Sequence, residues 1–91
     1  MWIRSQNLYV IVNCETFFVK QCEKEKFDVI GDKSGRNILL GEYSTEEKAL
    51  KVLDEIQKEI FYLDAHGMTT NTGTWKTNYV YQMPQDDEVG L

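Results

Sequence analysis

The chain has 91 residues, which is enough for one small domain and too short for two separate cores. Hydrophobic residues make up 42% and charged residues 27%, which excludes global disorder and low-complexity architectures. The net charge is −5, no apolar run approaches ~18 residues, and the start lacks a signal-peptide pattern. We therefore expect a cytoplasmic protein that binds neither a membrane nor, directly, double-stranded nucleic acid.

The first half of the chain has the pattern of β-strands. Runs of apolar and β-branched residues separated by short polar breaks predict strands at residues 2–5, 8–12, 16–22, 27–30 and 37–40. The run at 8–12 is apolar on both faces, as in a central strand. Turn-forming residues at 32–35 separate the last two strands. Short strands with short turns predict an antiparallel meander over residues 2–42.

A helix follows the strands. Ser44 and Glu47 have the spacing of a capping box, with the Ser44 hydroxyl on the amide of Glu47. Apolar residues then recur at helical spacing, at Ala49, Val52, Leu53, Ile56, Ile60 and Leu63. Gly67 has the position of a C-cap. We predict a helix over residues 45–65, with its apolar stripe packed on one face of the meander.

The last quarter of the chain combines a polar stretch, a strand and an acidic tail. Residues 67–78 are polar and contain glycine, as in a loop. A final strand is expected at 79–83, stopped by Pro84. We predict a single α+β domain over residues 1–84, with an antiparallel meander of about four to five strands and one amphipathic helix packed on one of its faces. Residues 85–91 form an acidic tail with little to bury, expected to fray unless a partner holds it.

Two cysteines are too few for a disulfide scaffold. Cys14 and Cys22 both lie beside strand-like sequence, where a free cysteine behaves as a small apolar residue. Buried or half-buried free thiols are the favoured interpretation. A cross-strand disulfide and a reactive thiol remain as alternatives.

The residues that catalysis needs are scarce. His66 is the one histidine, and its place at a predicted helix end fits a surface residue better than a general base. One histidine and two distant cysteines do not form a tetrahedral metal set, and no glycine-rich phosphate loop occurs. We expect no enzymatic activity, no cofactor and no metal.

Two features suggest a binding surface. Trp75 stands in a polar loop, where a large aromatic is either a plug over the core or a binding anchor. The outer face of the helix and the tail carry acidic residues, among them Glu46, Glu55, Glu59, Asp86, Asp87 and Glu88. Such a face is either solvated or docks on a basic surface.

Three segments resemble an uncharacterised family of small proteins encoded by phages and prophages of Gram-positive bacteria. They are residues 1–6 (MWIRSQ), 40–50 (LGEYSTEEKAL) and 82–88 (QMPQDDE). The resemblance spans nearly the whole chain. It implies a phage-encoded protein in the bacterial cytoplasm and carries no activity or catalytic residue.

These observations lead to a hypothesis about function. We expect a non-enzymatic phage or prophage protein that binds and modulates a host or phage protein, for example as an anti-defence inhibitor. A small-ligand sponge, for instance for a signalling nucleotide, and a virion or assembly component are the alternatives. A homo-oligomer is compatible with each of them. The partner-binding residues assigned are Trp75, Glu46, Glu55, Glu59, Asp86, Asp87 and Glu88.

Overall fold

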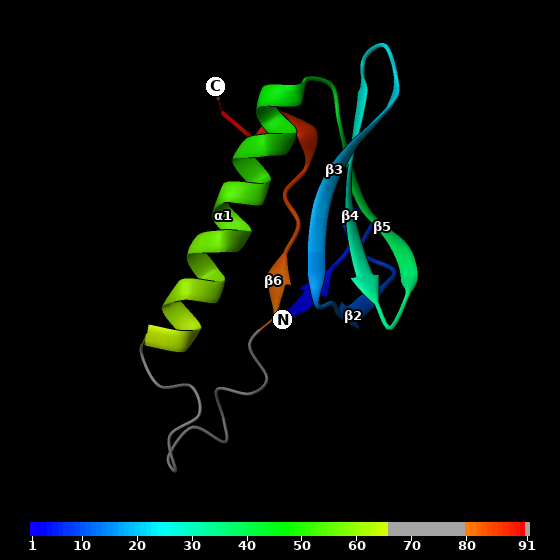
Figure 1. The fold of residues 1–91 in the computed structure, drawn as a ribbon. Helices are drawn as coiled ribbons and strands as arrows, with labels where there is room; N and C mark the ends of the chain where they lie inside the picture. The colour runs from blue at the N-terminus through cyan, green and yellow to red at the C-terminus, as the bar shows by residue number, and fades with distance from the viewer. Residues whose placement is uncertain (66–79, 91) are drawn as a thin grey trace.

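The computed structural model describes residues 1–65 and 80–90, and within them the chain adopts an α+β fold (Figure 1). The strands are β1 (Trp2–Arg4), β2 (Ile11–Asn13), β3 (Thr16–Glu23), β4 (Lys26–Lys33), β5 (Arg36–Tyr43) and β6 (Tyr81–Gln82). The helix is α1 (Glu46–Ala65), and a short 3-10 helix, η2 (Asp86–Glu88), follows β6. The predicted α+β class, with one helix packed on a sheet, is confirmed.

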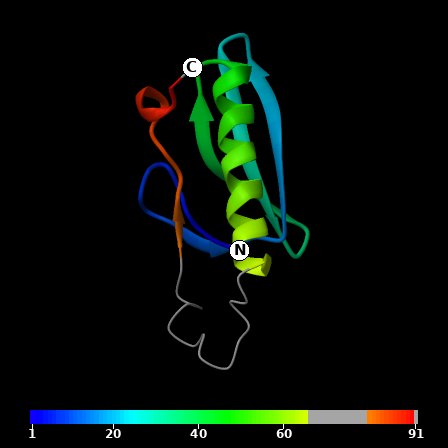
Figure 2. The same ribbon diagram turned by 90° about the vertical axis from the view of Figure 1, so that its left-hand side faces the viewer.

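The strands form two three-stranded sheets. β3, β4 and β5 are the antiparallel meander, and α1 lies across one of its faces (Figure 2). The other sheet has the order β2–β1–β6, with β2 antiparallel and β6 parallel to β1. The meander therefore covers less than the predicted residues 2–42. Because β1 is paired on both sides by β2 and β6, it cannot extend the meander.

The prediction of a central strand at residues 8–12 is wrong. β2 begins only at Ile11, and Leu8 has a left-handed backbone with φ of 74°. The backbone N–H of Ser5 donates to Val10 O at 2.8 Å, and that of Leu8 donates to Ser5 O at 2.9 Å. These bonds close residues 5–10 into a loop, and its apolar side chains are exposed.

The predicted turn between β4 and β5 is confirmed. Ser34 and Gly35 both have positive φ, 53° and 86°. Two consecutive residues with positive φ match the right-handed twist of the flanking strands, and glycine adopts that conformation without strain.

The helix begins one residue later than the predicted capping box. Thr45 Oγ1 accepts the backbone N–H of Lys48 at 3.1 Å, so Thr45 is the N-cap residue. Ser44 instead binds Asp86, at 2.8 Å through its backbone N–H and 3.1 Å through its hydroxyl. The predicted bond from the amide of Glu47 to Ser44 is therefore wrong. The helix reaches residue 65, as predicted, and the proposed C-cap Gly67 lies outside the described residues.

The core lies between α1 and the two sheets. From the helix, Ala49, Val52 and Ile56 are fully buried, while Ile60 is 36% exposed. The sheets and the C-terminal segment contribute the other buried side chains: Ile3, Cys14, Val29, Leu40, Tyr43, Met83 and Val89. The predicted apolar stripe of the helix thus packs as expected over its first three turns.

Cys14 fills a space that Gly31 leaves open. A Cβ atom on Gly31 would lie 2.5 Å from Cys14 Sγ, which is too close for any side chain. Cys14 is buried and free, and burial raises the pKa of its thiol. The buried free thiol predicted for Cys14 is confirmed.

The packing of α1 gives a test of the core. Ile56→Ala should lower the free energy of unfolding by about 2–5 kcal/mol, because it leaves a cavity under the middle of the helix. The matched control is Leu50→Ala on the same helix, where the side chain is 45% exposed and the loss should be about 1 kcal/mol or less. Urea denaturation measures both. Equal effects of the two substitutions would contradict the packing of α1 on the sheet.

Candidate partner-binding site

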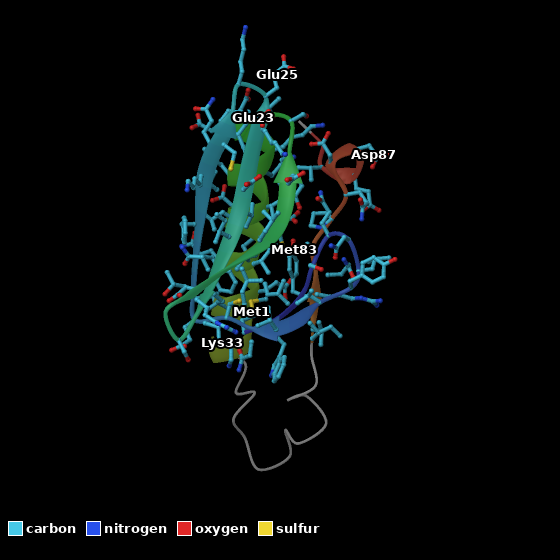
Figure 3. The ribbon with its side chains drawn as sticks, turned by 90° about the vertical axis from the view of Figure 1, so that its right-hand side faces the viewer. Met1, Glu23, Glu25, Lys33, Met83 and Asp87 are labelled. Carbon is cyan, nitrogen blue, oxygen red and sulfur yellow. The ribbon has the colours of Figure 1, made fainter. Side chains whose placement is uncertain are left out.

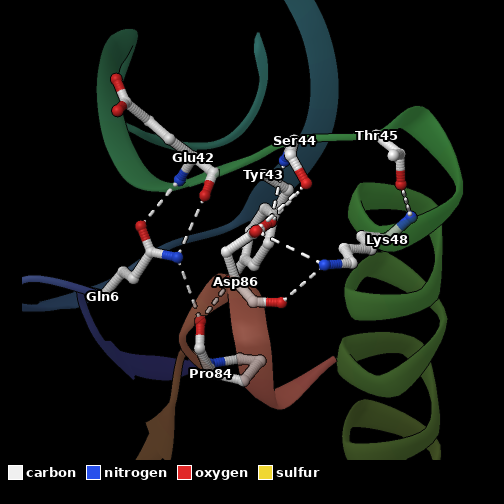
Figure 4. A network of polar contacts seen from close by, with 8 residues as sticks. All are labelled: Gln6, Glu42, Tyr43, Ser44, Thr45, Lys48, Pro84 and Asp86. Carbon is white, nitrogen blue, oxygen red and sulfur yellow. Dashed lines mark hydrogen bonds and ion pairs between the residues drawn. The ribbon is translucent and has the colours of Figure 1, made fainter. Parts of the chain in front are cut away.

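A network of polar contacts joins three segments of the chain at the N-terminal end of α1 (Figure 4). We call it the clamp, and it consists of Gln6, Glu42, Tyr43, Ser44, Lys48, Pro84 and Asp86. The Gln6 side chain accepts the backbone N–H of Glu42 at 2.9 Å and donates to Glu42 O at 3.1 Å. It also donates to Pro84 O at 3.2 Å, and the Tyr43 hydroxyl donates to the same oxygen at 2.7 Å.

Asp86 is the acidic centre of the clamp. Besides its bonds from Ser44, its carboxylate lies 3.4 Å from Lys48 Nζ. The backbone N–H of Ser44 is the main cause of a lowered pKa for Asp86, and the Ser44 hydroxyl and Lys48 add to it. The following segment is packed as well, since Val89 is only 7% exposed. The prediction that the tail has little to bury is wrong for Val89. That residues 85–91 fray unless a partner holds them stays a prediction.

The clamp joins residues 1–6, 40–50 and 82–88, the three segments quoted in the sequence analysis. Gln6 ends the first, Glu42 to Lys48 lie in the second, and Pro84 and Asp86 lie in the third. The side-chain groups named above bind one another within the chain. These segments therefore hold the fold together, and the clamp has the properties of a structural element rather than of a reaction centre.

The predicted acidic residues are brought together in part. Glu46, Asp87 and Glu88 are exposed, and they lie with Asp86 near the N-terminal end of α1 (Figure 1, Figure 3). Farther along the helix, Glu55 accepts the Tyr81 hydroxyl at 2.8 Å, and Glu59 is half-buried. Trp75 and His66 lie outside the described residues. The acidic surface at the helix start thus consists of four of the predicted residues: Glu46, Asp86, Asp87 and Glu88.

The loop at residues 5–10, which we call the Tyr9 loop, is rigidly built. Asn7 Oδ1 accepts the Ser5 hydroxyl at 2.6 Å and the backbone N–H of Tyr9 at 3.0 Å. Arg4 Nε donates to Leu8 O at 3.0 Å. These bonds hold Leu8 in its left-handed conformation, and at the tip the Tyr9 side chain is 90% exposed. A strained residue held by surrounding bonds next to a fully presented aromatic is typical of a functional loop.

The Tyr9 loop and the small sheet carry several exposed apolar residues: Trp2, Leu8, Tyr9, Val10, Ile11 and Val80. Three of them, Leu8, Tyr9 and Val10, are consecutive in the loop. Sequence reasoning missed these residues because an apolar run also fits a buried strand. The turn-forming Ser5 and Asn7 directly before the run were the available signal.

The Tyr9 loop lies next to the acidic surface. Gln85 Nε2, directly before η2, donates to Gln6 O at 2.7 Å. η2, which carries Asp87 and Glu88, therefore lies on the same side of the molecule as residues 5–10 (Figure 3). An apolar centre with a charged rim is the usual anatomy of a protein–protein interface.

Cys22 has no features of a nucleophile. The thiol is exposed, contrary to the predicted buried or half-buried thiol, and donates to Asp28 Oδ2 at 2.6 Å. This hydrogen bond is the main cause of a raised pKa for Cys22, and some loss of hydration adds to it. A raised pKa keeps the thiol protonated, and a protonated thiol is a poor nucleophile.

Two hollows are lined by described residues. One of about 470 Å³ lies at the β3–β4 hairpin among the charged residues Glu23, Lys24, Glu25 and Lys26, and one of about 180 Å³ lies between residues 5–7 and 39–42. Within residues 1–65 and 80–90, no three side chains are grouped as metal ligands. In the same part of the chain, no helix is long and apolar enough to cross a membrane.

No protein-family model matches the chain, and no curated protein or solved structure matches it either. The site is therefore interpreted from its own geometry.

The lowered pKa of Asp86 predicts a pH dependence of stability. A carboxylate with a lower pKa in the folded than in the unfolded chain stabilises the fold above the unfolded value of ~3.9, and this contribution disappears as the pH falls through the folded value. The difference in unfolding free energy between the wild type and Asp86→Asn should therefore be largest above about pH 5 and shrink below about pH 4. Urea denaturation across this range measures it. Asp87→Asn removes a neighbouring exposed charge and is the control.

A difference that stays constant from neutral to acidic pH would contradict this role of Asp86. A pH dependence of the same size for Asp87→Asn would mean that net charge, rather than the clamp, is responsible.

Proposed function

We propose that this chain is a non-enzymatic binding protein whose Tyr9 loop anchors it on a partner protein with a basic surface. The observation that carries the proposal is the rigid presentation of Tyr9, 90% exposed at the tip of a hydrogen-bonded loop. The resemblance to phage and prophage proteins favours a host or phage protein as the partner. Inhibition of a host defence protein by covering its surface would be one such role.

The Tyr9 loop is suited to binding because its shape is fixed before the partner arrives. Ordering a flexible side chain or loop on binding costs about 0.5–1.5 kcal/mol per immobilised side chain. Tyr9 follows a residue whose conformation is already held by Arg4 and Ser5, so little backbone order remains to be gained. Tyrosine is also among the residues that contribute most at interfaces.

The charges near the loop favour a basic partner. Asp87 and Glu88 lie on the same side of the molecule as the loop, and the whole chain carries a net charge of −5. Such charges speed association with a surface of opposite sign, while the apolar centre slows dissociation. A protein surface with an apolar recess and a basic rim therefore fits this site best.

Tyr9→Ala tests the proposal. The substitution should weaken partner binding by about 2 kcal/mol or more, roughly thirtyfold, mainly through faster dissociation. The matched control is Phe61→Ala, because Phe61 is 70% exposed on α1, away from the Tyr9 loop. A tagged chain used in pull-downs from infected cells should recover a protein with the wild type and Phe61→Ala and not with Tyr9→Ala. Interferometry with that protein then measures the association and dissociation rates of the wild type and of both variants.

If the wild type, Tyr9→Ala and Phe61→Ala all recover the same proteins, the Tyr9 loop is not the partner-binding site. Both substituted side chains are exposed, so both variants should keep the wild-type circular dichroism spectrum.

Asp87 and Glu88 should act mainly on the rate of association with the partner. In a double variant, Asp87→Asn with Glu88→Gln, association with the recovered partner should slow several-fold at low salt, and dissociation should change little. The difference should shrink as salt is raised, because screening shortens the range of the charges. An unchanged association rate at low salt would remove the acidic residues from the mechanism.

Trp75 stays a prediction. Trp75→Ala in the same pull-down decides whether residue 75 adds to the surface that Tyr9 provides.

A further inference from the structure

The β3–β4–β5 sheet has one face that no described element covers. Figure 3 shows this face in front, with α1 behind it. Pairing register places Phe18, Ile30 and Leu39 side by side across the three strands. They alternate with the core-facing Val19 and Val29, so the row lies on the open face. Solvated faces of antiparallel sheets are normally polar, and an apolar row across all three strands is therefore unusual.

A charged row lies next to the apolar row. The register pairs Lys20 with Asp28 and Asp28 with Glu42, again across all three strands. Lys26, two residues before Asp28 on the same strand, lies 3.3 Å from Glu42. Asp32, two residues after Ile30 on β4, lies on the same face. The two lysines and the three acids sum to −1, so this partly apolar face is close to neutral on a chain whose net charge is −5.

We infer that this face binds a second copy of the chain and forms a two-fold symmetric dimer. With the two-fold axis parallel to the strands and over β4, β3 of each copy lies opposite β5 of the other. Lys20 of each copy then faces Glu42 of the other, and Phe18 faces Leu39. Ile30 meets its own counterpart at the axis. Between β3 of one copy and β5 of the other, the two faces are complementary in both charge and apolar content.

The charges also select this arrangement over its alternative. A two-fold axis across the strands, along the apolar row, would place Asp28 opposite Asp32 and leave Lys20 without an acidic counterpart. In the inferred arrangement Asp28 and Asp32 each lie opposite their own copy, so the number of acid–acid contacts is the same, but Lys20 gains Glu42 as its counterpart. Asp28 is only 6% exposed and accepts the Cys22 thiol, so its carboxylate is set below the contact surface.

A charge swap tests the dimer and its geometry together. The wild type should sediment as a dimer, and Lys20→Glu and Glu42→Lys should each weaken dimerisation at least about tenfold, because each places like charges at both symmetric contacts. An equimolar mixture of the two variants should recover the dimer, since the acid introduced by Lys20→Glu in one copy then faces the base introduced by Glu42→Lys in the other. Sedimentation velocity measures the fraction of dimer in the wild type, in each single variant and in the mixture of the two variants.

Lys58→Glu is the matched control. It makes the same charge change at an exposed position on α1, on the other side of the sheet, and should leave the dimer intact. Circular dichroism of each variant confirms that it is folded. A wild type that is monomeric at millimolar concentration would overturn the inference. So would a mixture that stays monomeric while each variant is folded.

Discussion

The clamp around Gln6 and Asp86 is the constraint on which the rest of the structure depends. The β2–β1–β6 sheet has strands of only three, three and two residues, which is too short to be stable by itself. It is held because Gln6 binds β5 and Pro84, while Asp86 fixes the following segment to Ser44 and Lys48. Gln6 is also part of the Tyr9 loop. The contacts that close the fold therefore also fix the loop that presents Tyr9.

The helix shows how much of the fold local sequence predicts. The apolar stripe at Val52 and Ile56 predicts which face is buried, since helical spacing needs no knowledge of distant residues. The N-cap was displaced by one residue because Ser44 binds Asp86, 42 residues away, and Thr45 takes the capping role. A local pattern cannot reveal a competing partner that far along the chain. The parallel pairing of β6 with β1 was missed for the same reason.

The candidate site was predicted less well than the fold. The acidic residues Asp87 and Glu88 are exposed, as the proposed acidic binding surface requires. The Tyr9 loop, which we propose as the anchor, was not predicted, since the apolar run at 8–12 fits a buried central strand and an exposed surface equally well by composition. The hydrogen bonds of Asn7 and Ser5 decide between them, because they turn the chain before a strand can form.

The identity of residue 8 supports a binding role for the loop. A left-handed conformation costs a residue with a side chain about 1–2 kcal/mol and costs glycine almost nothing. With glycine at position 8, the loop closed by Ser5 and Asn7 would therefore form with less conformational strain than with leucine. Leu8 is also half-exposed, so its side chain returns little of that energy through packing within the chain. A leucine under strain and in contact with solvent agrees with the proposed apolar contact of this loop with a partner, made together with Tyr9.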